Sequence, residues 1–282
     1  MHIVCVRNRE GSYATMANRE ASLKLIGRQV EELGYRQIKR AEQLKPKHVW
    51  ALIERWKGEE ITDATVKNRM AHLRWLAEKT DNRGLVARDN DNYGIGRRQY
   101  VTNESRALKF DNEKIDLIQD RYVQLSAELQ REFGLRREEA MKLIPAKAIQ
   151  EDRLVLQGSW CKGGKERVIP IRTEAQKDVL KRARIFVGER SMIPPNRTYV
   201  QHMRVYEKAM GKVGLGRTHG ARHMYAQQRY QDLTGRLPPA LGGQSRRDMT
   251  KEEREKDDEI RLEISRELGH ERIQIVAVYI GS

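Results

Sequence analysis

The sequence predicts a mainly α-helical protein with one small β-hairpin, divided into an N-terminal helical domain and a C-terminal α+β domain. Apolar residues recur at helical spacing through most of the chain, and only two short stretches near its middle have the composition of strands. A polar segment rich in Asn, Asp, Gly and Arg interrupts this periodicity from about residue 81 to residue 103. Because 282 residues suffice for two cores, we expect one domain over residues 1–103, linker included, and another over 104–282.

The chain is strongly basic. Its 55 Lys and Arg residues exceed its 40 Asp and Glu residues, which leaves a net charge of +15 and favours a polyanion as partner. Nucleic acid is a better candidate than a membrane, because no apolar run approaches the roughly 18 residues that span a bilayer. Neither a secretory signal nor a metal-binding cysteine pattern is present, and Cys5 and Cys161 have no spaced partners. We therefore expect a cytoplasmic protein.

Three helices are expected in the first domain. The first runs from Gly11 to Gly34, because its apolar residues follow helical spacing and a glycine suits the position after a helix. The second begins at about Pro46, since proline fits the first helical turn. The third begins at Thr62 or Asp63, either of which can cap the amino end of a helix.

Basic residues on the third helix and in the linker are candidates for contact with a nucleic acid backbone. Such residues are usually solvated, but in a chain of this charge they also suit phosphate. The candidates are Lys67, Arg69 and Arg74 on the helix and Arg97 and Arg98 in the linker.

The second domain is expected to begin with helices and continue with a hairpin. Caps, apolar periodicity and a glycine after Phe133 delimit the helices, and β-branched runs mark the strands. The expected elements are a helix from Asp111 to Phe133, a short helix to about Ile144, strands at 153–157 and 167–171, and helices at 174–186 and 199–213.

A further helix is expected to open at Thr218. It is followed by a polar stretch with Gly and Pro that becomes densely charged, at about residues 234–258. We interpret this stretch as a surface loop that leads into a charged helix. A final helix, near Glu259 to Leu268, ends at Gly269.

Six residues of this domain form a set with a common chemistry. Each has an ordinary structural explanation when considered alone. Together they are the groups required to attack a phosphodiester without a metal: fixed cations for the phosphate oxygens, an acid, a base and a covalent nucleophile. They are Arg136, Lys162, His219, Arg222, His270 and Tyr279.

Four motifs carry these residues in a fixed order. They are the box Phe133–Glu139, the hairpin Cys161–Pro170, the box His219–His223, and Leu268-Gly269-His270 with Tyr279 nine residues later. In this order they resemble the motifs of the tyrosine recombinases of the phage integrase superfamily. Phenylalanine replaces the threonine of the first box, and cysteine replaces the first glycine of the hairpin.

The N-terminal region is similar, more weakly, to the core-binding domain of integrases from mobile and conjugative elements. The stretches 48–52 and 68–75 carry this likeness. It implies a C-shaped clamp, in which the core-binding domain and the catalytic domain grip double-stranded DNA.

The resemblance implies a role for each motif residue that contacts DNA. Tyr279 would attack the scissile phosphate and form a 3′-phosphotyrosyl bond, while Arg136 and Arg222 hold its non-bridging oxygens. Lys162 would protonate the leaving 5′-oxygen, and Lys165 is the competing choice. Because the covalent bond conserves the energy of the phosphodiester, neither ATP nor a metal cofactor is implied.

Three further residues support this chemistry in the family. His219 would act as acid and base toward the tyrosine, and His270 would donate a hydrogen bond to the phosphate. Glu139 would orient an arginine.

The resemblance implies an integrase of a mobile element that carries out site-specific DNA recombination. It would assemble as a homotetramer on two paired DNA sites, be monomeric when free, and work with host or element-encoded accessory proteins. Two alternatives remain open. One is a non-catalytic DNA-binding accessory factor of the same fold, and the other is an enzyme like the type IB topoisomerases.

Three departures from the family pattern lead to expectations of their own. The long interval between His219 and His270 indicates an insertion at 234–258. Alternating apolar residues from Ile273 to Tyr279 suggest a strand, but the resemblance favours a helix. The sequence ends three residues after Tyr279, so we expect subunit exchange to use the tyrosine segment itself or another element, or to be weak.

Overall fold

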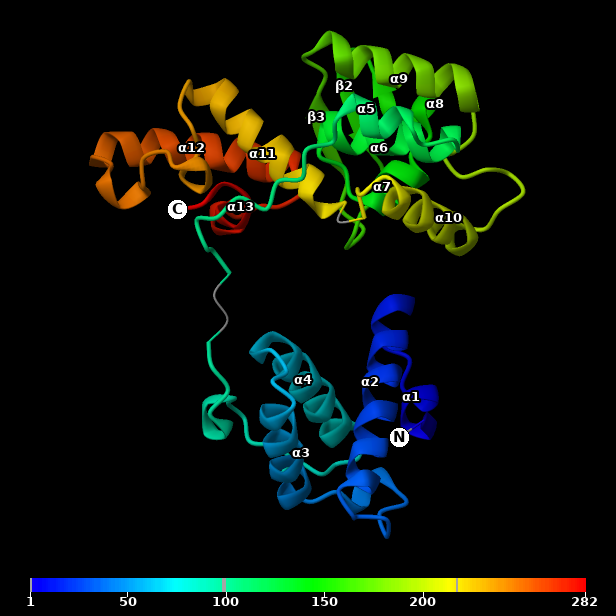
Figure 1. Cartoon of the computed structure of the whole chain (residues 1–282), viewed down its shortest axis with the longest axis vertical. Coiled ribbons are helices and arrows are strands. Elements are labelled where there is room, and N and C mark those ends of the chain that lie inside the picture. The colour runs from blue at the N-terminus through cyan, green and yellow to red at the C-terminus, as the bar shows by residue number, and fades with distance from the viewer. Residues whose placement is uncertain (1, 98–99, 217) are drawn as a thin grey trace. The chain divides into compact units, whose positions relative to one another are not determined.

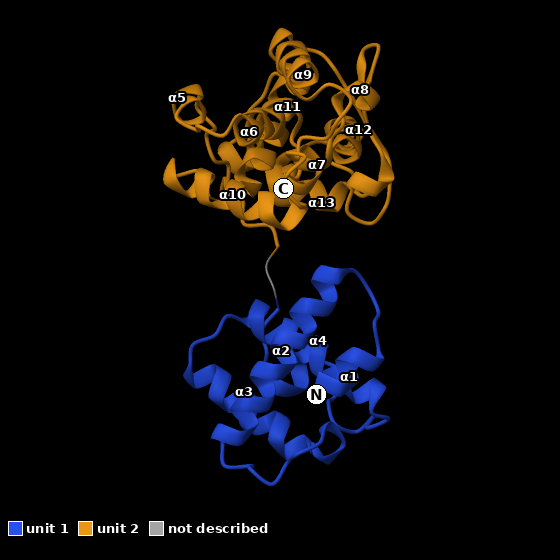
Figure 2. Cartoon of the chain, turned by 90° about the vertical axis from the view of Figure 1, so that its right-hand side faces the viewer, with its two compact units in different colours: residues 1–99 blue, residues 100–282 orange. Residues whose placement is uncertain are grey.

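The computed structural model describes residues 2–97, 100–216 and 218–282. It divides the chain into two compact units, residues 1–99 and residues 100–282 (Figure 2). One hydrophobic core lies in the first unit and three adjoining clusters lie in the second. The predicted fold class, mainly helical with one small sheet, is confirmed.

The first unit is a small helical domain (Figure 1). Leu23, Leu52, Trp56 and Leu73 come from its three long helices and are fully or almost fully buried together. The long helices begin where the sequence predicts, since Ser12 and Thr62 accept backbone N–H bonds and Pro46 occupies the first turn. The helices are α1 (His2–Arg7), α2 (Tyr13–Glu32), η1 (Ala41–Gln43), α3 (Pro46–Gly58), α4 (Asp63–Lys79) and η2 (Asp91–Tyr93).

The second unit holds the remaining helices. Within it, α13 packs against both α11 and α12, and α6 packs against α7, α9 and α11 (Figure 1). Its α-helices are α5 (Asn112–Asp116), α6 (Arg121–Phe133), α7 (Arg137–Lys142), α8 (Pro145–Ala148), α9 (Glu174–Val187), α10 (Tyr199–Lys212), α11 (His219–Thr234), α12 (Lys251–Glu267) and α13 (Ile273–Ile280). Its 3-10 turns are η3 (Gly158–Trp160), η4 (Pro239–Leu241) and η5 (Arg246–Asp248).

The sheet of the second unit is antiparallel, with strand order β1 (Ile149–Gln150), β2 (Arg153–Leu156) and β3 (Arg167–Pro170). The pairing of Leu154 with Ile169 sets the register of β2 and β3, and both side chains are fully buried. The two predicted strands are therefore present. The sequence pattern missed β1, because two residues are too few to show an alternation.

Two predicted helix boundaries are wrong. The single helix expected from Asp111 to Phe133 is divided into α5 and α6, because the Asp120 side chain accepts the backbone N–H groups of Tyr122 and Val123 and starts a new helix. The charged helix expected within 234–258 and the final helix expected near Glu259 are one helix, α12, which begins at Lys251, since Thr250 and Glu253 form a capping box.

The interval from 234 to 258 is an ordered path in the structure. It contains η4, η5 and the first half of α12. The Arg246 guanidinium pairs with the carboxylates of Asp257 and Asp258 and joins the loop to that helix. Among the described helices, none is long and apolar enough to cross a membrane.

Candidate active site

A buried carboxylate organises two arginines at the start of α7. Glu139 Oε1 accepts from Arg136 Nη1 at 2.6 Å, and Oε2 accepts from the Arg136 backbone N at 2.7 Å and from Arg167 Nη2 at 2.6 Å. Burial raises the pKa of Glu139, but the charges of Arg167 and Arg136 outweigh it, so the pKa lies below its usual value. One carboxylate thus faces two cations and leaves an excess of positive charge.

A third arginine, Arg222, reaches the same place from α11. It is buried, and it donates from Nη1 to the Gly134 carbonyl at 2.5 Å and from Nη2 to the Leu268 carbonyl at 2.6 Å. Arg136 Nη2 also lies 3.3 Å from the Leu268 carbonyl. Burial lowers the pKa of Arg222.

His270 follows the glycine that ends α12. Gly269 has φ +73°, and a Cβ there would lie 3.1 Å from Arg167 Cδ, so glycine lets the chain turn against the arginines. His270 Nε2 is 3.2 Å from Arg136 Nη2. Because a guanidinium only donates, Nε2 accepts and the ring proton lies on Nδ1. Burial, followed by the charge of Arg136, lowers the pKa of His270 to about 4.

Tyr279 on α13 belongs to the same cluster. Its ring centroid lies 5.7 Å from that of His219 and 4.8 Å from that of His223, and Arg222 Cζ lies 5.7 Å from it. The Tyr279 carbonyl accepts from Gln227 Nε2 at 2.9 Å, which ties the turn of α13 that carries the tyrosine to α11. Only 5% of Tyr279 is exposed.

The two histidines beside the tyrosine are neutral at neutral pH. Burial and the charges of Arg222 and Arg136 lower the pKa of His219, and burial and His219 lower that of His223 to about 4. A neutral imidazole next to a phenol can accept its proton.

The hairpin lysines are exposed. Lys162 lies in the turn between η3 and β3, and Lys165 pairs with Glu271 at 2.6 Å. Since Glu271 follows His270, this pair ties the hairpin to the histidine loop. The structure thus brings Arg136, His219, Arg222 and the tyrosine together with His270, and leaves Lys162 on a solvent-exposed turn.

Two residues of this cluster were not singled out from the sequence. Arg167 pairs with Glu139, and its Nε and Nη1 are buried without a partner. His223 touches the tyrosine ring. Arg167 lies in the hairpin motif 161–170 and His223 in the box 219–223, so the motifs themselves could have identified both residues as candidates. Among the described residues, no group of three or more His, Cys, Asp or Glu side chains could hold a metal ion.

The basic candidates of the first unit have different surroundings. Arg69 is half-buried, with its guanidinium 5.1 Å from the Trp56 ring centroid, and Arg74 donates to the Ala87 carbonyl at 3.1 Å and to Asn90 Oδ1 at 2.7 Å. These two therefore help to hold their own domain together. Lys67 is partly exposed and Arg97 is exposed, whereas Arg98 lies outside the described residues.

Two family models match the chain in succession. Residues 2–83 match the model described as phage integrase, N-terminal, and residues 96–228 match the model described as integrase. The chain belongs to the phage integrase family of tyrosine recombinases. The second match ends before His270 and Tyr279, so these two residues rest on motif spacing and geometry.

Solved structures with the same fold include those of three recombinases. A lambda integrase dimer bound to a COC' core site is 15% identical, with a TM-score of 0.63 over 99% of this chain and 94% of that one. XerH site-specific recombinase in a post-cleavage complex with difH is 17% identical, with TM-score 0.60 and coverage of 99% and 79%. The Tn1549 transposon integrase with transposon right end DNA is 11% identical, with TM-score 0.60 and coverage of 99% and 95%. No curated protein matches the sequence.

Proposed function

We propose that the chain is a site-specific DNA recombinase that cleaves and rejoins double-stranded DNA through a 3′-phosphotyrosyl intermediate. The observation that carries this proposal is the position of Tyr279, whose ring lies beside His219, His223 and Arg222 in a cluster with an excess of positive charge. Membership of the recombinase family and the DNA-bound state of the similar structures support it.

The cationic cluster suits a phosphodiester. Within this cluster, three buried guanidinium N–H groups have no hydrogen-bond partner among the described residues: Nε of Arg222 and both Nε and Nη1 of Arg167. A buried donor without a partner is costly, and a phosphate oxygen would satisfy it. Arg136 and Arg222 would hold the non-bridging oxygens as negative charge accumulates on them.

The proposed reaction is an exchange of one ester for another. The Tyr279 oxygen forms a bond to phosphorus, its proton passes to His219, and the bond to the 5′-oxygen breaks. Lys162 supplies the proton that the leaving 5′-oxygen needs, with Lys165 as the competing donor. A 5′-hydroxyl from a second strand then reverses the steps, so no ATP is consumed.

His270 would change partners when DNA binds. In the free protein its Nε2 accepts from Arg136, so it cannot donate from that atom to a phosphate. A bound phosphate would stabilise the protonated ring and raise its pKa, so that Nε2 becomes a donor. The same charge would draw Arg136 toward the phosphate oxygen.

Double-stranded DNA is the proposed partner of both units. The net charge of +15 suits it, and the candidates for backbone contact remain Lys67, Arg69, Arg74, Arg97, Arg98 and Lys165. Among similar structures, lambda integrase was solved as a tetramer bound to a Holliday junction. We infer that this chain also assembles as a homotetramer on paired DNA sites, with accessory proteins that choose the direction of the reaction.

Covalent trapping tests the proposed reaction. Wild-type protein is mixed with a pool of nicked DNA duplexes of randomised sequence, and adducts that survive detergent denaturation are recovered and sequenced. We expect adducts with the wild type and none with Tyr279→Phe, because the phenyl ring keeps the packing but cannot form the ester.

Arg222→Lys is the companion variant. It should lower adduct formation on the recovered sequences by a factor of about 10² to 10³, because an ammonium group cannot replace two directed donors. DNA binding, which many basic residues share, should persist. No adduct with any sequence would favour the accessory factor, and relaxation of supercoils without recombinant products would favour a topoisomerase.

A further inference from the structure

A buried hydrogen bond next to the arginine cluster has no part in the proposed chemistry. Tyr225 stands one helical turn after Arg222 on α11, and its hydroxyl donates to Glu267 Oε2 at 2.6 Å. Only 7% of Tyr225 and 3% of Glu267 are exposed. Burial and the charge of Glu267 raise the pKa of Tyr225, so the hydroxyl keeps its proton and donates.

The same pair touches both residues whose carbonyls hold Arg222. A Cβ built on Gly134 would lie 2.7 Å from the Tyr225 ring and 3.2 Å from the Leu268 side chain, so these three residues are in close contact. Glu267 is the last residue of α12 and directly precedes Leu268. Arg222 bonds to the carbonyls of Gly134 and Leu268. Tyr225 thus packs against Gly134, and its hydroxyl bonds to Glu267, the residue before Leu268.

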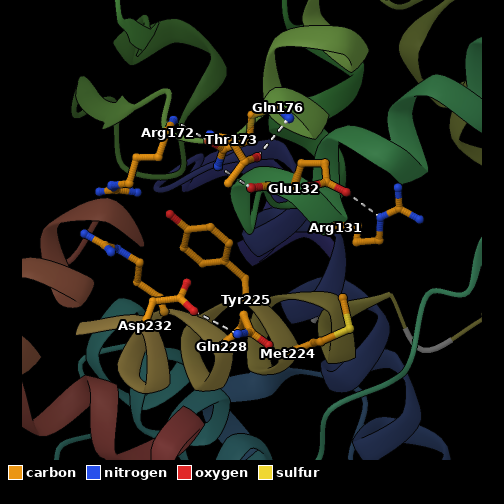
Figure 3. A pocket seen from close by; sticks show the side chains of 10 residues that line it. Arg131, Glu132, Arg172, Thr173, Gln176, Met224, Tyr225, Gln228 and Asp232 are labelled. Atoms are coloured by element: carbon orange, nitrogen blue, oxygen red, sulfur yellow. Dashed lines mark hydrogen bonds and ion pairs between the residues drawn. The ribbon is translucent and has the colours of Figure 1, made fainter. Parts of the chain in front are cut away.

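A cavity adjoins Tyr225. It has a volume of about 470 Å³ and is lined by Arg172, Tyr225, Gln228 and Arg229, among others. Figure 3 shows Tyr225 rising from α11 with its hydroxyl directed toward the Arg172 side of the cavity. On this side Glu267 is held by polar bonds, from Arg172 and from Arg229 Nε at 3.3 Å as well as from the tyrosine.

We propose that Tyr225 and Glu267 are positioning residues that fix the Gly134 and Leu268 carbonyls, and through them the orientation of Arg222 and Arg136. The inference rests on the function proposed above, in which these arginines hold the scissile phosphate. A guanidinium bound to two fixed acceptors has one orientation, and Arg222 then presents its free Nε in a constant direction. If the two carbonyls move apart, that direction is lost.

The chain offers a matched control within the same two helices. Tyr230 on α11 is also buried, with 1% exposed against 7% for Tyr225, and donates to Asp257 Oδ1 of α12 at 2.7 Å. It lies eight residues beyond Arg222, about 12 Å along the helix at roughly 1.5 Å per residue. Tyr225→Phe and Tyr230→Phe therefore each delete one buried tyrosine–carboxylate bond between α11 and α12, and only the first lies beside the arginines.

Two measurements on these variants test the proposal. The first follows the arginine Nε–H resonances of the isotope-labelled full chain by NMR, without DNA. We expect the Arg222 and Arg136 resonances to shift or broaden in Tyr225→Phe and to stay in place in Tyr230→Phe. The second measures single-turnover adduct formation and DNA affinity on duplexes recovered by covalent trapping.

In the second measurement, Tyr225→Phe should slow adduct formation on the order of tenfold to a hundredfold, as small misplacements do, with DNA affinity unchanged. Tyr230→Phe should match the wild type. Unchanged Arg222 resonances in Tyr225→Phe, or equal losses of rate in both variants, would overturn the positioning role. If the wild type forms no adduct, the proposed function fails, and the resonances alone still decide whether Tyr225 holds the arginines.

Glu267→Gln extends the same test. Glutamine keeps an acceptor for the Tyr225 hydroxyl but removes the charge that Arg172 and Arg229 share. The proposal predicts that its Arg222 resonance lies nearer to the wild type than that of Tyr225→Phe. The reverse order would assign the effect to the arginine network and overturn the role of the hydroxyl.

Discussion

At the scale of single residues, charge and burial explain the properties of the site. Arg136 and Arg167 pair with one buried carboxylate, Glu139, and Arg222 binds two backbone carbonyls beside them, so the cluster holds uncompensated positive charge away from water. Burial, followed by this positive charge, lowers the pKa values of His219 and His270. The same electrostatics would favour a phosphate and leave a neutral base beside the tyrosine.

The lowered histidine pKa values predict a loss of stability in acid. His223 and His270 titrate at about 4 in the folded chain against 6.5 for an unperturbed histidine. Between these values the unfolded chain binds more protons, so the free energy of unfolding falls as pH drops from about 6.5 to about 4. After allowance for partial exposure, we expect a loss on the order of 1 kcal/mol per histidine.

Urea unfolding across this pH range measures the effect. A double variant, His223→Gln with His270→Gln, removes both titrations and should lose less stability on acidification than the wild type does. Parallel curves for the two proteins would contradict the assignment.

At the scale of secondary structure, glycines that follow two helices position residues of the candidate site. Gly134 ends α6 with φ +58° and Gly269 follows α12 with φ +73°. Each reversal places a residue of the candidate site, Arg136 or His270, within two positions of the glycine. The sequence predicts both helix ends correctly, because a left-handed cap is a local property of glycine.

Gly134→Ala tests how much stability depends on a glycine at the end of α6. The substitution adds the strain of positive φ, about 1 to 2 kcal/mol, to a contact 2.7 Å from the Tyr225 ring that costs another 1 to 3 kcal/mol or so. Gly235→Ala is the control, since Gly235 ends α11 at φ +68° and has nothing within 4 Å of an added Cβ. Chemical denaturation should show a clearly larger loss of unfolding free energy for Gly134→Ala than for Gly235→Ala. Equal losses would show that the Tyr225 side chain moves aside without cost.

The helix α13 shows where a local pattern is ambiguous. Apolar residues alternate from Ile273 to Tyr279 as in a strand, yet the segment is helical. In the structure Val276, Tyr279 and Ile280 are buried, a spacing of three and four that fits one helical face. The segment is helical despite its alternation because α11 and α12 pack against this apolar face of α13.

At the scale of the whole molecule, each unit closes a core from its own residues. The core of residues 1–99 contains Leu52 among its fully buried side chains. The clusters of residues 100–282 contain Tyr225, Leu268 and Tyr279, which lie in or beside the candidate active site. The stability of the site therefore depends on packing within the second unit.

Leu52→Ala tests this division. The cavity it leaves should destabilise residues 1–99 by roughly 2 to 5 kcal/mol. Hydrogen exchange followed by mass spectrometry should show faster exchange in peptides from those residues, with peptides around Arg136, Arg222 and Tyr279 unchanged. Faster exchange throughout the chain would instead show that the two units unfold together.

The sequence pattern predicted the fold class, most helix ends and five residues of the candidate cluster, Arg136, His219, Arg222, His270 and Tyr279. These follow from periodicity, caps and motif spacing, which are properties of short stretches of chain. Only the tertiary structure showed that Arg167 and His223 join the cluster and that Arg74 bonds within its own domain. The carbonyls that hold Arg222 lie 88 and 46 residues away from it in sequence. No local pattern encodes such a bond, because it forms only when separate helices pack and bring their ends together.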